Sequence, residues 1–598
     1  MSPSPRTSES LARRIRMARG LEPADLCVEH VNVVDVFSRT LLRDISVTAG
    51  DGVFLGFGPS GLPARRRMDA RGRFMLPGLM DAHLHLESTM LTPAEFARLV
   101  VPHGTAAVVA DPHEIANVLG LAGLRYLLES SRDLPLDLRL ALPSCVPCTP
   151  FEDSGAVLAA ADLAPLMGHE RVCALGEMMN YPGLLAGDPA VLDKIVLARA
   201  SGKRLDGHAP GLLQARLDAY CGTGVASDHE CESPEEVVQR LARGMYVFVR
   251  HGSAARNLPA LLRAVHVNNA HRCCFCTDDS SPADLLERGH MDEILRLAVA
   301  EGLDPLLAVG MATLNGCVFY DMRDRGGIAP GWAADFCLVD DLRGFRVREV
   351  FRAGRQVAQE GRLCVELPAA RERRPAAPPS SDVLDTIHIA PLTQEALRLP
   401  VPSGRARVMG LTPQSLITRA LILPVALDRG CFDPQQNPGL AKIAVVERHK
   451  ATGQVGVGIL HGYLRPDAVF DGAIATSIAH DSHNIVVAGG NDRDMLAAVE
   501  SLRAMGGGIC CLQRGRTLAA LPLPVAGLIS PEPGREVAAR KAALLATARR
   551  HFALNPDLDP VMALSFMALP VIPELKLTAR GLFDVQGFSF VPVDAEKA

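Results

Sequence analysis

The stretch FMLPGLMDAHLHLESTM, residues 74–90, contains the pattern that decides the fold. A Pro-Gly break follows its first apolar run, and a second short apolar segment ends in His83 and His85, with Leu84 between them. Because alternate side chains of a strand lie on one face, both histidines point the same way from the end of a predicted strand. Neutral imidazole is a common ligand of divalent transition metals, so the pair indicates part of a metal site. Two partly buried, hydrogen-bonded structural histidines are the alternative explanation of the pair alone.

Apolar strand-like runs alternate with helix-like patterns, such as residues 115–130, throughout the segment 77–330. Eight parallel strands with crossover helices in about 250 residues are typical of a (β/α)8 TIM barrel. The sequence therefore predicts an α/β fold of this kind. The strand candidates are residues 78–82, 106–110, 138–142, 172–176, 204–207, 224–227, 246–249 and 273–277.

Polar residues follow six of these strand candidates, at the end of the barrel where this fold keeps its active sites. Histidines with bridging carboxylates suit a pair of divalent cations, which lowers the pKa of a shared water and holds the attacking oxygen. Mixed imidazole and carboxylate ligands favour Mn, Fe or Zn over Ca or Mg. The set predicts hydrolysis or deamination, because the activated water is the nucleophile. The residues are His83, His85, Asp111, His113, Glu114, Glu177, His208, Asp228, His229, Glu230, Asp278 and Asp279.

Composition excludes several other function classes. The 598 residues carry a net charge of −5 with one Trp and six Tyr, so we expect no nucleic-acid partner. No apolar signal region, polybasic segment or membrane-length apolar run is present, so we expect no membrane association and a cytoplasmic protein. No glycine-rich dinucleotide or phosphate motif follows a strand. The two Cys-x-x-Cys pairs, Cys145 with Cys148 and Cys273 with Cys276, are interpreted as buried thiols rather than zinc ligands.

The order His-x-His, Glu, His, His, Asp resembles the amidohydrolase superfamily, in which a small β-sandwich is built from both sides of the barrel. Several longer motifs resemble the bacterial-type adenine deaminases: PGLMDAHLHLESTM at 77–90, ADPHEIANVLG at 110–120, LGEMMNYPG at 175–183, DGHAPG at 206–211, SDHE at 227–230 and CTDDSSP at 276–282. HGY at 461–463, AHDSHNIVVAGGND at 479–492 and SFMALPVIPELKLT at 565–578 resemble the C-terminal domain of that family. One departure is His251, where the family pattern suggests Glu.

The resemblance implies hydrolytic deamination of adenine to hypoxanthine and ammonia in purine salvage, by a metal-activated hydroxide that attacks C6. It implies two divalent metal ions, manganese or alternatively iron, and a homo-oligomer such as a dimer. Asp278 would carry the proton of the hydroxide to the departing amine, and Glu114, or alternatively Glu230, would protonate ring N1. Asp111, His113, Glu114 and Glu230 would contact the substrate, and His229 is counted with Asp278 and Glu114 as catalytic. The implied metal ligands are His83, His85, Glu177, His208, His229 and Asp278, with Glu177 as the bridge.

The predicted domain organisation has two β segments that flank the barrel and pair with each other, followed by a separate C-terminal α/β domain. The segments are an N-terminal arm at 1–23, the first part of the β-sandwich at 24–76, the metal-dependent barrel at 77–330, the second part of the sandwich at 331–370, a Pro- and Arg-rich linker at 371–382 and the adenine-deaminase-like domain at 383–598. His461, His480, Asp481 and His483 either line the cleft or stabilise their own domain. His103, His169 and His290 are expected at the surface.

Three other interpretations compete. Another amidohydrolase, such as a cytosine or guanine deaminase or a cyclic-amide hydrolase, needs the same metal ligands, and only pocket residues such as ADPHEIAN favour adenine. The zinc nucleobase deaminase fold needs H-x-E followed by P-C-x-x-C, but Ser144 replaces that proline here and the downstream ligands would be unused. A non-catalytic scaffold is expected to have lost ligands, and none is missing. A carboxylated lysine is not expected as the bridge, because Lys194 and Lys203 are predicted to lie away from the mouth of the barrel.

Overall fold

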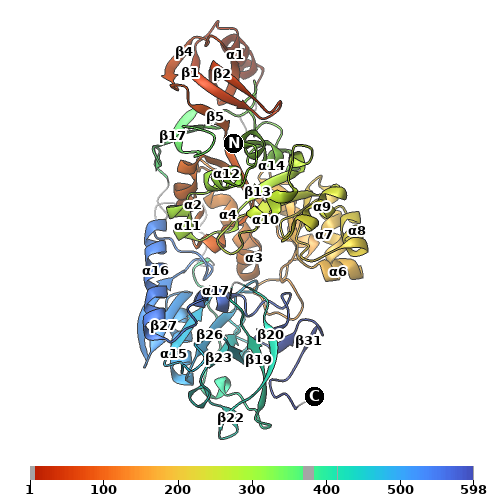
Figure 1. Ribbon diagram of the computed structural model, residues 1–598, viewed down its shortest axis with the longest axis vertical. Coiled ribbons are helices and arrows are strands. Elements are labelled where there is room, and N and C mark those ends of the chain that lie inside the picture. Colours follow the sequence, from red (N-terminus) through yellow and green to blue (C-terminus); the bar gives the residue numbers. More distant parts are fainter. Residues whose placement is uncertain (1–6, 368–382, 414, 597–598) are drawn as a thin grey trace.

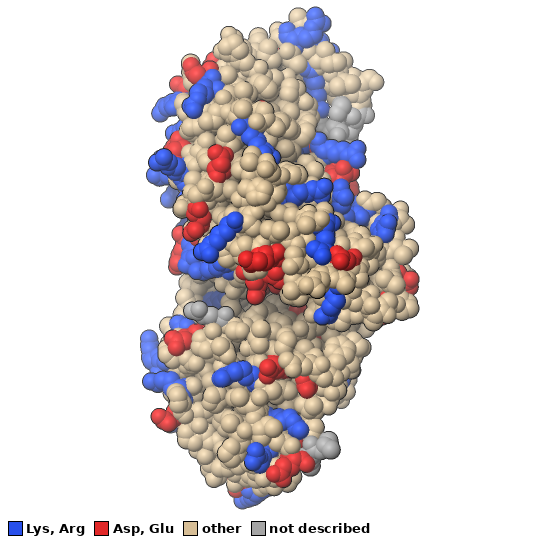
Figure 2. All heavy atoms as spheres, turned by 45° about the vertical axis from the view of Figure 1, so that its right-hand side comes forward, with Lys and Arg blue, Asp and Glu red and all other residues tan. Residues whose placement is uncertain are grey.

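The computed structural model describes residues 7–367, 383–413 and 415–596, so the predicted linker at 371–382 lies outside the described residues. The molecule is elongated (Figure 1). A β-rich part with the N-terminal strands lies at one end, the helix-covered central part follows, and the C-terminal part lies at the other end. On the face in Figure 2, Lys and Arg are interspersed with Asp and Glu, and no continuous basic stripe crosses that face.

The β-rich part joins strands from both sides of the central part, as the sequence predicted. Helix α1 (Ser8–Ala18) begins at Thr7, whose side chain accepts a hydrogen bond from Ser10 N. β5 pairs antiparallel with β15, and the buried rings of Phe336 and Phe351 stack 4.4 Å apart in the core of this part. The strands of this sheet are β1 (Ala24–Asp35), β2 (Thr40–Gly50), β3 (Val53–Gly58), β4 (Ala64–Asp69), β5 (Phe74–Pro77), β15 (Phe336–Val339), β16 (Val347–Arg352), β17 (Arg355–Gln359) and β18 (Arg362–Leu363).

The central part contains parallel strands at the predicted barrel positions, except that the predicted strand 224–227 is replaced by the two-residue β11 at Ser227–Asp228, because Gly224 has a φ of +100° and belongs to the preceding turn. A curled six-stranded sheet has the order β10-β9-β8-β7-β6-β14, and a three-stranded sheet has the order β11-β12-β13. All residues of β6, β7 and β9 are buried, as expected for parallel strands that helices cover. The bounds are β6 (Leu79–His85), β7 (Thr105–Ala110), β8 (Asp137–Leu142), β9 (Val172–Met178), β10 (Arg204–Gly207), β11 (Ser227–Asp228), β12 (Tyr246–Arg250), β13 (Cys273–Cys276) and β14 (Asp278–Asp279).

The connections between these strands carry the helices that cover the central part. The predicted helix at 115–130 is instead two helices, because Gly120 has a φ of +58°, a conformation that ends the first helix and that glycine adopts readily. The helices are α2 (Pro93–Val100), α3 (His113–Leu119), α4 (Leu121–Ser130), α5 (Ala160–Met167), α6 (Tyr181–Ala186), α7 (Pro189–Ala200), α8 (Gln214–Gly222), α9 (Pro234–Ala242), α10 (Leu258–Leu261), α11 (Pro282–Glu287), α12 (Met291–Ala300), α13 (Pro305–Met311) and α14 (Leu314–Phe319).

The C-terminal part is built on an eight-stranded sheet in the order β20-β19-β24-β23-β26-β25-β27-β28, in which only β19 and β24 pair in parallel. α15 packs on β25, β26 and β27, while α16 reaches α11 of the central part. In the described segments no helix combines the length and apolar character that a membrane crossing requires. The elements are β19 (Arg405–Gly410), β20 (Arg419–Pro424), β23 (Leu440–Val446), β24 (Val455–His461), β25 (Ala473–Thr476), β26 (Ile485–Gly489), β27 (Gly508–Gln513), β28 (Arg516–Pro522), α15 (Asp492–Ala504), α16 (Gly534–His551) and α17 (Pro560–Ser565).

Candidate active site

The six predicted metal ligands lie together at the C-terminal ends of the parallel strands. Nitrogen and oxygen atoms from each of three overlapping groups lie within 4.8 Å of one another. These groups are His83, His229 and Asp278; His83, His85 and Glu177; and Glu177, His208 and His229. His208 is half-buried and the other five are buried. The parallel strands of the central part therefore bring to one point a set that is dispersed over almost 200 positions of the sequence, from 83 to 278.

Glu177 is at the centre of this ligand set. Its Oε1 lies 3.3 Å from His85 Nε2. Its Oε2 lies 2.7 Å from His208 Nδ1 and 3.1 Å from His229 Nε2. On the other side, Asp278 Oδ1 lies 3.1 Å from His85 Nε2 and 3.6 Å from His83 Nε2. The two oxygens of Glu177 thus face different histidines, which is the geometry that a bridging carboxylate requires.

The chemistry of this set fits divalent cations. His83 Nε2 is buried and has no hydrogen-bond partner among the described residues, although buried polar atoms are normally paired. Burial lowers the pKa of His83, but the hydrogen bond between Nδ1 and Asp206 and the nearby carboxylates of Asp278 and Glu177 outweigh burial and raise this pKa to about 10. The carboxylates thus create a strongly negative environment around imidazole nitrogens, an environment that a cation would neutralise.

The second ring nitrogens of His83 and His85 are held by carboxylate and carbonyl oxygens. His85 Nδ1 donates to the Asp111 carbonyl at 3.0 Å, which leaves its Nε2 lone pair directed at the ligand set. His83 Nδ1 lies 3.2 Å from Asp206 Oδ2, and the Tyr320 hydroxyl donates to the same oxygen at 3.2 Å. Such contacts fix the tautomer and orientation of a ligating imidazole.

Asp111 and Gly176 set the position of Glu177. The Glu177 backbone N–H donates to Asp111 Oδ2 at 2.7 Å. A Cβ atom at Gly176 would lie 2.1 Å from the same oxygen, so only glycine permits this close approach. The carboxylate of Asp111, predicted as a pocket residue, is therefore bonded to the backbone that carries the central ligand.

A buried ion pair joins the loops that carry His208 and His229. Asp228 Oδ1 accepts hydrogen bonds from the backbone N–H groups of Ala209 at 3.1 Å and Glu230 at 3.0 Å. Its Oδ2 accepts from Arg240 Nε at 2.9 Å, and Arg240 Nη2 donates to the Ala209 carbonyl at 2.7 Å. Both side chains are fully buried. The Asp228 carboxylate thus binds the residues that directly follow His208 and His229.

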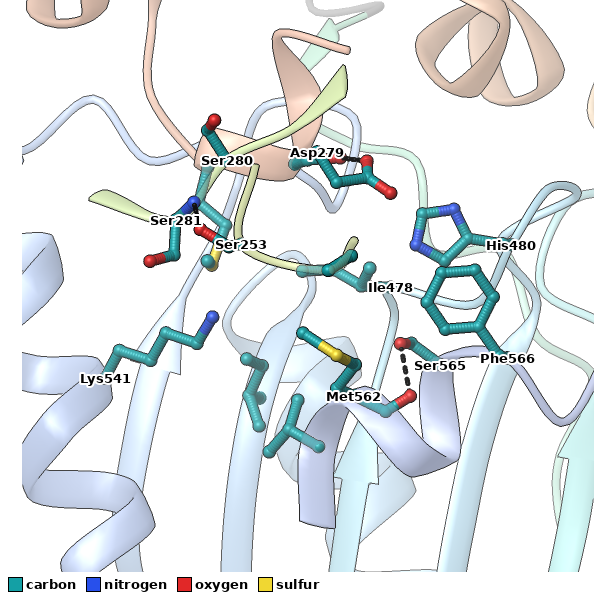
Figure 3. A pocket seen from close by; sticks show the side chains of 15 residues that line it. Ser253, Asp279, Ser280, Ser281, Ile478, His480, Lys541, Met562, Ser565 and Phe566 are labelled. Carbon is teal, nitrogen blue, oxygen red and sulfur yellow. Dashed lines mark hydrogen bonds between the residues drawn. The ribbon is translucent and has the colours of Figure 1, made fainter. Parts of the chain in front are cut away.

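A pocket opens beside the ligand set, between the central and C-terminal parts (Figure 3). The central part contributes Ser88, Asp279 and Ser280 to its lining, and the C-terminal part contributes His480, Phe566 and Lys541. The rings of His480 and Phe566 stack 4.3 Å apart with an angle of 11° between their planes. The pocket thus combines two stacked aromatic rings with polar side chains from both parts.

The chain is similar to known proteins along most of its length. Residues 74–357 match the amidohydrolase family, and residues 415–589 match the adenine deaminase C-terminal domain. An adenine deaminase of Nitratidesulfovibrio vulgaris is 55% identical to this chain, over 97% of this chain and 98% of the relative. This chain belongs to the adenine deaminase family. An adenine deaminase of Geobacillus kaustophilus is 43% identical over 98% of this chain and 99% of its own. The solved structure of molinate hydrolase has a TM-score of 0.42 and 17% identity, over 59% of this chain and 99% of that one.

His251, the departure from the family pattern, lies outside the ligand set. It lines a small separate cavity with Arg256 and Arg288. Burial and these two cations lower the pKa of His251 to about 4. The preceding residue, Arg250, points to the site instead, where its Nη1 donates to Asp278 Oδ2 at 2.9 Å and to Glu230 Oε1. The exchange at position 251 therefore removes no side chain from the metal ligands.

Several functional contacts were not predicted from the sequence. Asp206 was not among the predicted residues; it lies within β10, two positions before His208, and its Oδ2 lies 3.2 Å from His83 Nδ1. His480 lines the pocket, whereas His461 ends β24 within the C-terminal sheet. The prediction of a surface position for His290 is wrong, because its ring is buried between Thr105 and Asp81, with Nδ1 2.8 Å from Thr105 Oγ1 and Nε2 3.1 Å from Asp81 Oδ2.

The predicted burial of the cysteines in the two Cys-x-x-Cys pairs is confirmed. Cys145, Cys148, Cys273 and Cys276 are all free and buried. The Lys203 amine donates to the Val172 carbonyl at 2.6 Å, at the start of β9 and so at the end away from the ligand set, as predicted. Lys194 lies nearer the site than predicted, because its buried amine donates at 2.7 Å to the carbonyl of Ser144, which follows β8, and the Ser144 hydroxyl donates to the Glu177 carbonyl.

Proposed function

We propose that this chain hydrolyses adenine to hypoxanthine and ammonia. The observation that carries this assignment is the 55% identity to an adenine deaminase over 97% of the chain, which spans the barrel and the C-terminal part together. The complete ligand set at one point of the central part supports catalysis over a scaffold role. The metal ligands are common to several amidohydrolases, so the assignment of adenine depends on this full-length similarity.

We infer that the two parallel sheets of the central part are segments of one (β/α)8 barrel. β10 lies beside β11, where Ala226 N donates to the Leu205 carbonyl at 3.0 Å. β13 lies beside β6, where Thr277 N donates to Asp81 Oδ1 at 3.1 Å. These contacts support closure at both junctions. The predicted domain boundaries and the predicted dimer stay predictions.

The residues that would hold two divalent metals, manganese or iron, divide into two groups around Glu177. His83, His85 and Asp278 would hold one ion, and His208 and His229 the other, with Glu177 shared. When bound, such a pair supplies a water of lowered pKa as the nucleophile and compensates the negative charge of the carboxylates.

The side chains of the site divide the proton transfers between them. Asp278 is held through Oδ2 by Arg250, so its Oδ1 faces the ligand set and can carry a proton to the departing amine. Glu114 rather than Glu230 is the better donor to ring N1. Glu230 is held by the Arg250 guanidinium, which also binds Asp278. Glu114 instead faces His480, with which it can share a proton.

The assignment is tested by offering adenine, adenosine, cytosine and guanine to the manganese-loaded protein and measuring ammonia release. We expect adenine to react fastest. Faster release from adenosine or cytosine would contradict the substrate assignment. Elemental analysis of the same preparation should find about two metal equivalents per chain, the stoichiometry of a two-metal site, and a firm value of one would remove the bridging role of Glu177.

A further inference from the structure

The loop at residues 478–484 of the C-terminal part is bonded to the central part beside the active site. The Ser482 hydroxyl donates to Glu152 Oε1 at 2.6 Å, and Asn484 Nδ2 donates to the Asp153 carbonyl at 2.7 Å. Asp481 Oδ1 lies 3.7 Å from His113 Nε2. All three loop side chains are buried. The loop therefore has a defined position relative to the barrel.

The same loop is fixed from its own side by Arg448, which is fully buried. The Arg448 guanidinium donates to the His483 carbonyl and, through Nη2, to the Ala526 carbonyl at 3.0 Å. The Arg448 backbone N–H donates to Asn484 Oδ1 at 3.2 Å. Contacts on both sides thus determine where the loop histidines lie.

The proton of His483 is placed by its hydrogen bonds. The backbone N–H of Ala479 donates to His483 Nδ1 at 3.1 Å, so this nitrogen is an acceptor. Burial lowers the pKa of His483 well below its usual value, and the neutral ring then carries its single proton on Nε2. Nε2 lies 3.8 Å from Glu114 Oε2 and is otherwise unpartnered among the described residues. The ring therefore presents a fixed N–H donor to Glu114.

This tautomer argues against a metal role for His483. A ligating imidazole normally donates its second N–H to an acceptor, and here the second nitrogen itself accepts from an N–H. His483 is therefore suited to hold a carboxylate and not a cation.

Glu114 needs such support because it is buried beside a second carboxylate. Burial and the charge of Glu114 raise the pKa of the Glu87 carboxyl to about 7. From the C-terminal part, His480 Nδ1 lies 3.3 Å from Glu114 Oε1, while His483 faces the other oxygen. His480 also lines the pocket of Figure 3. One histidine thus contacts the pocket and the carboxylate together, and the other contacts only the carboxylate.

We propose that the 478–484 loop completes the catalytic site and that His483 is a positioning residue, which orients Glu114 toward adenine. This inference rests on the proposed function. It gives the C-terminal part a direct place in catalysis, through a donor that lies more than 350 positions after the carboxylate it holds. Catalytic hydrogen bonds that are long without substrate tighten when substrate is bound, so the present separation is compatible with this role.

The test compares His483→Leu, which removes the donor, with His483→Gln, which returns an N–H at nearly the same distance from the backbone. We expect His483→Leu to lower kcat about 10- to 100-fold with little change in KM. This decrease is smaller than the decrease expected when the positioned acid itself is removed. We expect His483→Gln to recover most of that loss. His461→Leu, which alters a C-terminal histidine outside the pocket, serves as the control for nonspecific destabilisation. Metal content and thermal midpoint are measured for every variant.

A double-mutant cycle with Glu114→Gln gives the decisive result. If His483 acts through Glu114, the double variant is no slower than Glu114→Gln alone, because the two changes remove one function. The inference would be overturned if the kcat decreases of the two single variants multiplied in the double variant, or if His483→Leu had the kcat of wild type. Either result would leave the assignment of adenine deamination intact. Loss of metal or an equal kcat decrease in His461→Leu would assign His483 a structural role. A wild-type protein that releases no ammonia from adenine would overturn the proposed function and this inference with it.

Discussion

Replacing Arg240 by Met should destabilise the central part and weaken metal binding at the same time. Both members of the Asp228–Arg240 pair are fully buried, so the substitution leaves an anion in the interior without its cation. Breaking a buried pair costs about 3–5 kcal/mol. Asp228 keeps two backbone donors, at 3.0 and 3.1 Å, which places the expected loss near the lower limit, about 3 kcal/mol. At about 2 °C per kcal/mol for a large domain, the thermal midpoint should fall by roughly 6 °C.

The effect on metal follows from the position of the pair. Ala209 and Glu230, which Asp228 binds, directly follow His208 and His229 in the chain. Loss of a contact that orients a ligand typically costs about 10- to 100-fold in metal affinity. The assay is calorimetric melting of metal-free protein, followed by manganese titration.

A matched control is available on the same segment. Arg243 forms an ion pair with Asp218, whose side chain is 60% exposed, and exposed pairs contribute about 0–1 kcal/mol. Arg243→Met should therefore change little. The double variant Asp228→Asn with Arg240→Met should be less destabilised than the two single losses added together, because the buried charge is removed as well. A melting curve of Arg240→Met that matches Arg243→Met would refute the reasoning.

Three further predictions concern single side chains. Asp278→Asn should retain metal and lower turnover by about 10²–10⁴, the usual contribution of a positioned acid–base; near-normal turnover would move the proton transfer to another group. By elemental analysis, Glu177→Ala should lose at least one metal, whereas Lys194→Ala and Lys203→Ala should keep two and need no bicarbonate during metal loading. Loss of metal in a lysine variant but not in Glu177→Ala would mean that a lysine is the bridge. Burial and a neighbouring carboxylate raise the pKa of Glu152 from 4.5 to about 8, so the native state retains a proton that the unfolded chain loses. That contribution to stability is complete below pH 4.5 and is lost as pH rises to about 8, by up to about 1.4 kcal/mol per pH unit. In Glu152→Gln the thermal midpoint should not show this decrease with pH. Midpoints of wild type and variant that change in parallel with pH would contradict the prediction.

The parallel strands of the central part and the set of side chains gathered at their ends were predictable because their signals are local. Each member of the set lies at or just after the end of a predicted strand, and in an α/β fold of this kind that end is a known place for catalysis. His480 and His483 carry no comparable local signal, since their role depends on how the C-terminal part docks against the loop that holds Glu114. Likewise, the burial of His290 results from packing against Thr105 and Asp81, which no pattern around position 290 reports.

The pairing of β5 with β15 has a consequence for synthesis of the chain. Phe74 pairs with Val339, so the edge of β5 stays open while the whole central part is made. At about 5–20 residues per second, the ribosome needs roughly 10–50 s to produce the missing partner. During that time the nascent N-terminal strands present unpaired N–H and C=O groups, which can pair with strands of other chains. Slow translation or release before Val339 would therefore favour aggregation, and a chaperone that covers β5 during this interval would raise the yield of folded protein.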